Sequence, residues 1–263
     1  MKTQNDLTVS NTIFLLLFVF SLFLEGILHS ALYLFAFLAA ILYGIKQAPL
    51  ESDRLAPLRL SSLRDTASAL PLIPPILALT MLTALGFSYL FALFGIGAQT
   101  PPEGSFWQAL WAHALLPAVC EEMLFRYLPL VLLGRENPRG LLLTSALFFA
   151  LGHVSLPHMP YAFLAGVCYM LLVLLTGNVW ITVLAHFCNN LLSLLLTFYP
   201  SAATGILIAF SLLTIGCIVW LIVRWPTYRD RIRPLLRGRS HEYFTRWPLL
   251  YTACVLMLCA LAL

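Results

Sequence analysis

Residues 203–224 read ATGILIAFSLLTIGCIVWLIVR, in which the first charged side chain is Arg224 at the end of the run. A helix rises about 1.5 Å per residue, so about 20 residues cross the roughly 30 Å hydrocarbon core of a bilayer. Apolar runs of this length are typical of transmembrane helices. The run therefore predicts a membrane span and points to a membrane protein.

The composition of the whole chain agrees with this prediction. The chain has 263 residues, of which 61% are hydrophobic and 10% charged, and its mean hydropathy is +0.91. Soluble domains carry about 25% charged residues, so this composition excludes a water-soluble globule, and its high hydrophobicity excludes a disordered chain. The net charge of +4 is too small to indicate a nucleic-acid partner. The six cysteines lie in apolar runs without a CxxC pair, as expected of core residues.

Further apolar runs predict an all-α polytopic bundle of transmembrane helices, with about eight to nine spans in one integral-membrane domain, residues 1–263. The expected spans are 12–25, 27–45, 70–94, 107–133, 140–153, 159–176, 179–198, 203–224 and 248–263. Glu25 and Gly26 interrupt one long block, 12–45, which predicts a tight helical hairpin. A signal peptide is the alternative, but no small-residue cleavage site follows Leu24.

The basic residues predict the orientation of the chain. Fourteen of the fifteen Lys and Arg lie outside the expected spans or at their edges. They occupy the N-terminal tail and the segments 46–69, 134–139 and 224–247, which alternating spans place on one side. The positive-inside rule then predicts a cytoplasmic N-terminus in the cell (inner or plasma) membrane. The basic loop 224–247 could also bind anionic lipid, but we expect it to act as a topology determinant.

Polar side chains at membrane depth are costly, so each is a candidate functional residue. They are Glu25, His29, His113, Glu121, Glu122, Arg126, His153, His186, Asn189 and Asn190. Those with an evident chemical use fall in three spans, 107–133, 140–153 and 179–198.

The first of these spans holds two adjacent carboxylates with different surroundings. Glu122 and Arg126 are four residues apart, so they share a helix face and can pair, and we expect this pair to support the site. An unpaired arginine in a membrane would be expensive. Glu121 points about 100° away and is left without this partner, which makes it a candidate general base for activating water. Pro117, one turn earlier, predicts a kink that admits water.

The other two spans supply imidazoles and an amide. His153 ends one span, and His186 and Asn190, four residues apart, share a face of the other. Taken singly, each has a structural interpretation as an interhelical hydrogen-bonding group. Together with Glu121 they suit amide hydrolysis, because His186 and Asn190 could bind an oxyanion and His153 could orient water or protonate the leaving group. The sequence contains no GxSxG or HExxH motif.

Three motifs in order resemble the CPBP family of CAAX-type prenyl endopeptidases and their bacterial relatives, the abortive-infection proteins. They are Glu-Glu-x-x-x-Arg at 121–126, Phe-x-x-x-His at 149–153 and His-x-x-x-Asn at 186–190. The resemblance covers roughly 105–198 and implies an intramembrane glutamic endopeptidase with this segment as its catalytic core. It implies that Glu121 activates water beside His153, that His186 and Asn190 form the oxyanion hole, and that Glu122 and Arg126 support them.

The resemblance leaves the metal question open. The family has also been described as metalloproteases, and zinc would be held by Glu121, Glu122, His153 and His186. We expect a site without a cofactor.

The expected substrate is a membrane-anchored or exported protein or peptide, because the predicted topology places His153 towards the non-cytoplasmic side. Maturation of a C-terminal anchor, a sorting tail or a peptide precursor would fit. The spans at 12–94 and 203–263 are expected to serve packing and substrate access. The alternatives are a non-catalytic scaffold or immunity protein and a proton-linked transporter, although no matching halves typical of transporters are present.

Overall fold

A computed structural model of the chain describes residues 2–23, 26–49, 55–59, 63–96, 104–135 and 137–235, together with 251, 252 and 255. All regular structure in these residues is helical, which confirms the predicted all-α fold. The helices are α1 Lys2–Ser21, α2 Gly26–Gln47, α3 Leu63–Ala69, α4 Ile73–Ala92, α5 Phe106–Ala109, α6 Leu116–Glu122, α7 Leu128–Leu133, α8 Pro138–Gly152, α9 Met159–Thr176, α10 Trp180–Phe198, α11 Ala203–Val223 and α12 Trp225–Leu235.

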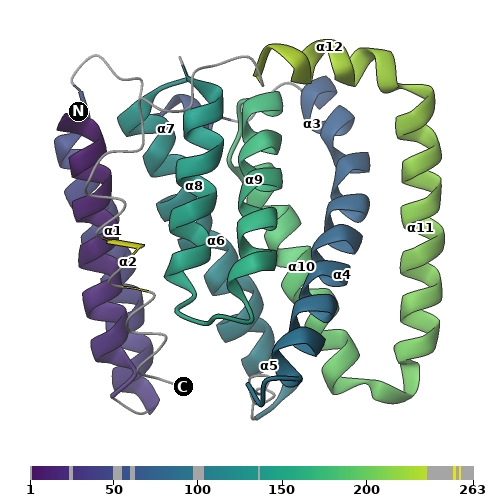
Figure 1. The fold of residues 1–263 in the computed structure, drawn as a ribbon, viewed down its shortest axis with the longest axis horizontal. Helices are drawn as coiled ribbons and strands as arrows, with labels where there is room; N and C mark the ends of the chain where they lie inside the picture. Colours follow the sequence, from purple (N-terminus) through teal and green to yellow (C-terminus); the bar gives the residue numbers. More distant parts are fainter. Residues whose placement is uncertain are drawn as a thin grey trace.

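The long helices stand side by side and run in alternating directions (Figure 1). The hairpin of α1 and α2 forms one edge of the bundle and α11 forms the other, with α8, α9, α10 and α4 between them. The short helix α12 lies across one end of the bundle, the end at which the chain begins. The predicted hairpin is present, and the Ser10 hydroxyl of α1 donates to the Ala40 carbonyl of α2 at 2.6 Å.

Five of the described helical stretches are long and apolar enough to cross a membrane. They are Ser30–Gln47, Asp65–Ala92, Met159–Thr176, Trp180–Phe198 and Pro200–Val223. The expected spans near 12–25 and 140–153 correspond to α1 and α8, whose apolar parts are shorter. The expected span 248–263 lies outside the described residues apart from three positions. The total number of spans therefore stays a prediction.

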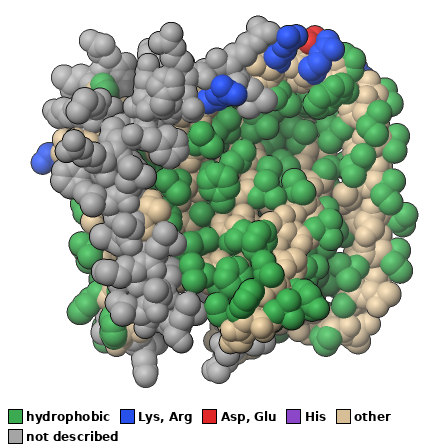
Figure 2. All heavy atoms as spheres, in the orientation of Figure 1, with side chains coloured by type: hydrophobic (Ala, Val, Ile, Leu, Met, Phe, Trp, Pro, Cys, Tyr) green, Lys and Arg blue, Asp and Glu red, His purple; other side chains and the backbone are tan. Residues whose placement is uncertain are grey.

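The basic side chains that are described gather toward one end of the bundle. In Figure 2 the Lys and Arg side chains lie toward the end that carries α12, and much of the remaining coloured face is hydrophobic. The sequence predicted a loop at 224–247, but α12 occupies Trp225–Leu235 within that segment. The apolar and charged residues of α12 lie on different faces, which favours a helix lying at the membrane surface.

The predicted span 107–133 is a helix interrupted twice. Turns of π-helix occupy Leu110–Leu115 and Met123–Tyr127, and each is followed by a proline, Pro117 or Pro129. Proline lacks an N–H and crowds the carbonyl four residues earlier, and a wider π turn accommodates that crowding. The carbonyl left free by Pro129 is that of Phe125, which accepts the Ser145 hydroxyl of α8 at 2.5 Å.

Helix α8 is short and packs closely on α9. Its 15 residues span about 22 Å, less than the roughly 30 Å hydrocarbon core, so a helix of this length that begins at a membrane surface ends within that core. A Cβ on Gly166 of α9 would lie 2.6 Å from the Ala146 Cα, so only glycine permits this approach. The chain leaves α8 through Val154, which has a φ of 46°. A β-branched residue rarely adopts this conformation, and the strained turn directly follows His153.

Candidate active site

A cavity of about 630 Å³ lies within the bundle, toward the end opposite α12. Its walls come from α1, α2, the interrupted helix, α8, α9 and α10. The last turn of α8 and the first turns of α9 border it, and the loop 153–158 between them stops short of that end of the bundle (Figure 1). The cavity is thus recessed from that end of the bundle.

The four residues expected to carry the chemistry all border this one cavity. They are Glu121, His153, His186 and Asn190. They come from three different elements, the interrupted helix, the end of α8 and the middle of α10. The two expected supporting residues, Glu122 and Arg126, do not line the cavity and are fully buried. The two groups therefore lie in different surroundings, while their roles stay predictions.

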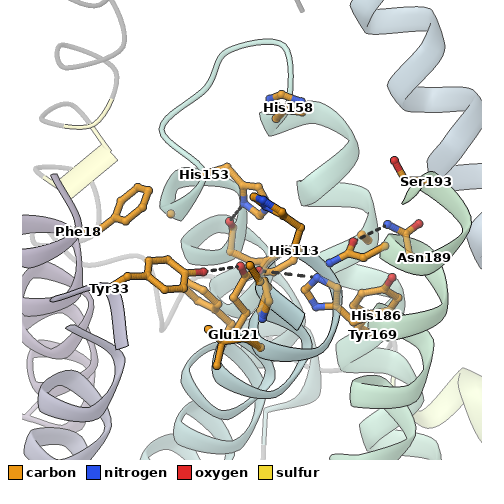
Figure 3. Close-up of a pocket in the computed structure, with 18 of the residues that line it drawn as sticks. Phe18, Tyr33, His113, Glu121, His153, His158, Tyr169, His186, Asn189 and Ser193 are labelled. Carbon is orange, nitrogen blue, oxygen red and sulfur yellow. Dashed lines mark hydrogen bonds and ion pairs between the residues drawn. The ribbon is translucent and has the colours of Figure 1, made fainter. Parts of the chain in front are cut away.

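Glu121 points into the cavity between two helices that are distant in sequence. In Figure 3 it lies between Tyr33 of α2 and His186 of α10. The Tyr33 hydroxyl is 3.4 Å from Glu121 Oε1, and His186 Nε2 is 3.8 Å from Glu121 Oε2. The side chain is 15% exposed, so water can reach it. The expectation that Glu121 faces away from Arg126 is met, but it has two polar neighbours that the sequence did not reveal.

Glu122 joins the arginine to the histidine. Its Oε2 lies 3.2 Å from Arg126 Nε, and its Oε1 accepts from His186 Nδ1 at 2.9 Å. A carboxylate only accepts, so Nδ1 carries the proton, and Nε2 is the ring nitrogen that faces Glu121. The Arg126 guanidinium carbon also lies 4.0 Å from the centre of the Phe149 ring, a cation–π contact. Glu122 thus fixes the orientation of His186 as well as neutralising Arg126.

His153 is held by its own helix. Its Nδ1 donates to the Phe149 carbonyl at 2.7 Å, because a carbonyl oxygen only accepts. Its Nε2 is left for water or substrate. The Phe149 ring lies 4.9 Å from the His153 ring and 5.7 Å from the His186 ring, centre to centre. Phe149 therefore packs between the two histidines and the arginine, a role that its place in the second motif did not disclose.

Asn190 borders the cavity beside a second amide. The Asn189 side chain donates to Asn190 Oδ1 at 3.3 Å, and the Thr80 hydroxyl of α4 donates to Asn189 Oδ1 at 3.4 Å. With its oxygen occupied in this way, Asn190 can turn its NH₂ group to a substrate.

Several lining residues were not foreseen as part of the site. Tyr33 is a single tyrosine in an apolar span, which by sequence resembles any interfacial aromatic residue. His158 and Tyr161 border the same cavity, and neither was among the candidate residues. His158 Nδ1 is 2.7 Å from the Ser155 hydroxyl. A histidine five residues after His153, across so short a loop, is the pattern that would have indicated it.

Within the part of the chain that the structure describes, no group of three or more His, Cys, Asp or Glu side chains could hold a metal ion. Glu122 is already engaged by Arg126 and His186. The expectation of a site without a cofactor stays a prediction, and no chemical step below is assigned to a metal.

Comparison with known proteins agrees with this site. Residues 102–192 match the family model of type II CAAX prenyl endopeptidases, Rce1-like. This range contains all three motifs quoted above. No curated protein and no solved structure matches the chain. The segment that holds the cavity's acidic and imidazole groups is thus similar in sequence to the type II CAAX prenyl endopeptidases.

Proposed function

We propose that this chain is a CAAX-type membrane protease that cleaves peptide bonds with water activated by Glu121. The observation that carries the proposal is the difference between two adjacent carboxylates. Glu122 is fully buried and engaged by Arg126 and His186, whereas Glu121 is partly exposed in the cavity. Paired carboxylates whose environments differ in this way are the usual basis for assigning separate roles in proton transfer.

The first step would be an attack by water on the scissile carbonyl carbon. Glu121 takes one proton from the water molecule as the oxygen forms the new C–O bond, and the carbonyl oxygen becomes an oxyanion. The Asn190 amide would donate a hydrogen bond to this oxyanion. His186 Nε2 would donate a second one when the ring carries a proton on both nitrogens, since Nδ1–H is already donated to Glu122. When the C–N bond breaks, the proton held by Glu121 passes to the leaving amine. The products are a carboxylic acid and an amine, which become a carboxylate and an ammonium group by transfer of the acid's proton, and Glu121 is again ionised.

His153 and Tyr33 would serve the water molecule rather than the oxyanion. Among the described residues, no protein group contacts His153 Nε2, and His153 borders the same cavity as Glu121. The Tyr33 hydroxyl lies against Glu121 Oε1. This leaves Oε2, the oxygen on the His186 side, to receive the proton.

The substrate we infer is a membrane-anchored or exported protein, cut near a C-terminal anchor or sorting segment. The cavity lies toward the end of the bundle opposite the basic side chains. Because basic segments are retained on the cytoplasmic side, a cleavage site at the other end favours substrates that have crossed or entered the membrane.

Cells that carry either wild-type protein or Glu121→Gln would test the catalytic proposal through the termini of their membrane proteins. We expect new termini with the wild type that are absent with Glu121→Gln, at equal amounts of folded protein. Asp230→Asn removes one carboxylate from the exposed surface of α12 and should preserve cleavage. Identical termini in the wild type and Glu121→Gln would indicate a scaffold or immunity role instead.

The orientation needs its own experiment. A reporter fused into the loop 154–158 should be active only on the non-cytoplasmic side. A cytoplasmic reading there would contradict the inferred class of substrate and leave the catalytic proposal standing.

A further inference from the structure

A second cavity, of about 750 Å³, lies at the basic end of the bundle, away from the candidate active site. It forms a groove between α3, α11 and α12 and is lined by Asp65, Ala67, Ser68, Trp220, Arg224, Thr227, Tyr228 and Arg231. These residues lie outside the segment that matches the protease family. The groove combines two guanidinium groups with hydroxyl and aromatic side chains, so its chemistry differs from that of the lipid-facing helices around it.

One of the two arginines is held rigidly in the wall of the groove. Arg231 donates to Asp65 Oδ1 at 3.1 Å and to the Ser68 hydroxyl at 3.3 Å. It also donates to the Leu175 carbonyl at 2.7 Å, at the C-terminal end of α9. The Tyr228 hydroxyl donates to the Ser68 carbonyl. These contacts tie α12 to α3 and α9 and form a preorganised wall.

The second arginine supplies a positive charge that no carboxylate offsets. Arg224 is exposed, and no hydrogen bond or ion pair of its side chain is found among the described residues. Asp65, the acidic residue of the groove, is engaged by Arg231. Both arginines lie close enough to Tyr228 to lower its pKa, against the larger effect of burial, which raises it. The groove therefore carries net positive charge, which favours an anion.

The position of the groove, at the end of a helix as long as the hydrocarbon core is thick, points to a lipid as the source of that anion. Helix α11 has 21 residues and one buried side chain, Thr214. It spans about 31 Å, the thickness of the hydrocarbon core. Arg224 follows directly, so the groove lies where phospholipid phosphates lie. Trp220, whose ring is 5.8 Å from that of Tyr228, marks the same interface, because tryptophan and tyrosine are enriched there.

We propose that the groove between α3, α11 and α12 binds the phosphate of an anionic phospholipid, with Arg224 and Arg231 as its cationic partners. The acyl chains would lie along the exposed apolar surface of α11. This role differs from that of a topology determinant, which needs only that the segment be positively charged. The proposed lipid site is saturable, and binding there depends on particular arginines rather than on how many the segment contains.

The test compares two variants that each remove one positive charge, one directly before α12 and one within it. Arg224→Gln removes the unpaired arginine of the groove. Arg229→Gln removes an arginine that does not line the groove and is paired with Asp230 at 3.2 Å. Full-length protein in detergent would be titrated with phosphatidylglycerol, phosphatidylcholine or inorganic phosphate while its unfolding temperature is followed.

We expect saturable stabilisation by phosphatidylglycerol and none by phosphatidylcholine or inorganic phosphate. One basic residue near an anionic surface contributes enough to change affinity about fivefold. The half-saturating concentration of phosphatidylglycerol should therefore rise about fivefold in Arg224→Gln and stay unchanged in Arg229→Gln. Equal shifts in the two variants, or equal stabilisation by the two lipids, would overturn the site. Stabilisation by inorganic phosphate alone would overturn the assignment to a lipid.

Discussion

Glu122→Gln should destabilise the fold more than Arg126→Met, although each breaks the same buried ion pair. Both side chains are fully buried, with Arg126 Nε 3.2 Å from Glu122 Oε2. Arginine stays protonated under all ordinary conditions, whereas a carboxylate can take up a proton and become neutral. In Glu122→Gln, Arg126 keeps its charge and is left with the ring faces of Phe149 and Tyr169.

The magnitudes follow from this asymmetry. Removing one partner of a buried pair costs about 3–5 kcal/mol when the other stays charged, which is the value expected for Glu122→Gln. Arg126→Met leaves a carboxylate that can be neutralised and still accepts from His186. Its cost should be that of one unsatisfied buried group, about 1–3 kcal/mol. The double variant should recover most of the loss, because the two substitutions together leave no buried charge from the pair.

Equilibrium unfolding in mixed micelles, followed by helical circular dichroism, would measure these free energies of unfolding. Glu121→Gln is the matched control, since it makes the same substitution one residue earlier on a side chain that borders the cavity. It should change the free energy of unfolding by less than about 1 kcal/mol. A loss in Glu121→Gln as large as in Glu122→Gln would refute the division of roles between the two carboxylates. A double variant less stable than either single one would refute the ion-pair explanation.

His186→Ala and Asn190→Ala should each slow cleavage about 10²–10³-fold, the usual effect of losing one oxyanion donor, in a peptide-release assay with purified protein. A change below about threefold would remove that residue from the oxyanion hole. Gly166→Ala should destabilise the protein by about 1–3 kcal/mol, because its Cβ would meet the α8 backbone at 2.6 Å, whereas Gly216→Ala on α11 has no atom within 4 Å and should be neutral or slightly stabilising. Treatment with a zinc chelator should leave the cleavage rate unchanged, and a loss restored by added zinc would revive the metal-dependent mechanism.

The sequence predicts the helices well because apolar periodicity and length are imposed by the bilayer itself. The expected span 159–176 has the bounds of α9, Met159–Thr176, since Pro160 and Gly177 mark its ends. The long span 107–133 was also located, but its two π turns were not. They depend on how each proline is accommodated, and the Ser145 hydroxyl that serves the Phe125 carbonyl comes from another helix.

In the site, too, the sequence predicts what local helical spacing sets and misses what depends on contacts from distant helices. Motif spacing predicted which residues of the matched segment would meet, since helical spacing fixes the face on which each side chain lies. It could not show that Tyr33 reaches Glu121, because the two are 88 residues apart and the contact depends on how the α1–α2 hairpin docks. It also missed α12, because a segment rich in arginine and proline resembles a loop until its apolar face has something to pack against.

The adjacency of the two glutamates explains how one short motif can hold a reactive carboxylate in a membrane. A lone carboxylate beside Arg126 would be engaged by it, and a lone carboxylate elsewhere would leave Arg126 without a counter-ion. Two successive glutamates differ by about 100° in direction on a helix, so one can neutralise the arginine while the other faces the cavity. His186 then connects them, with Nδ1 on Glu122 at 2.9 Å and Nε2 toward Glu121 at 3.8 Å. Arg126 therefore acts on Glu121 only through Glu122 and His186, which makes it a positioning residue for the proposed base.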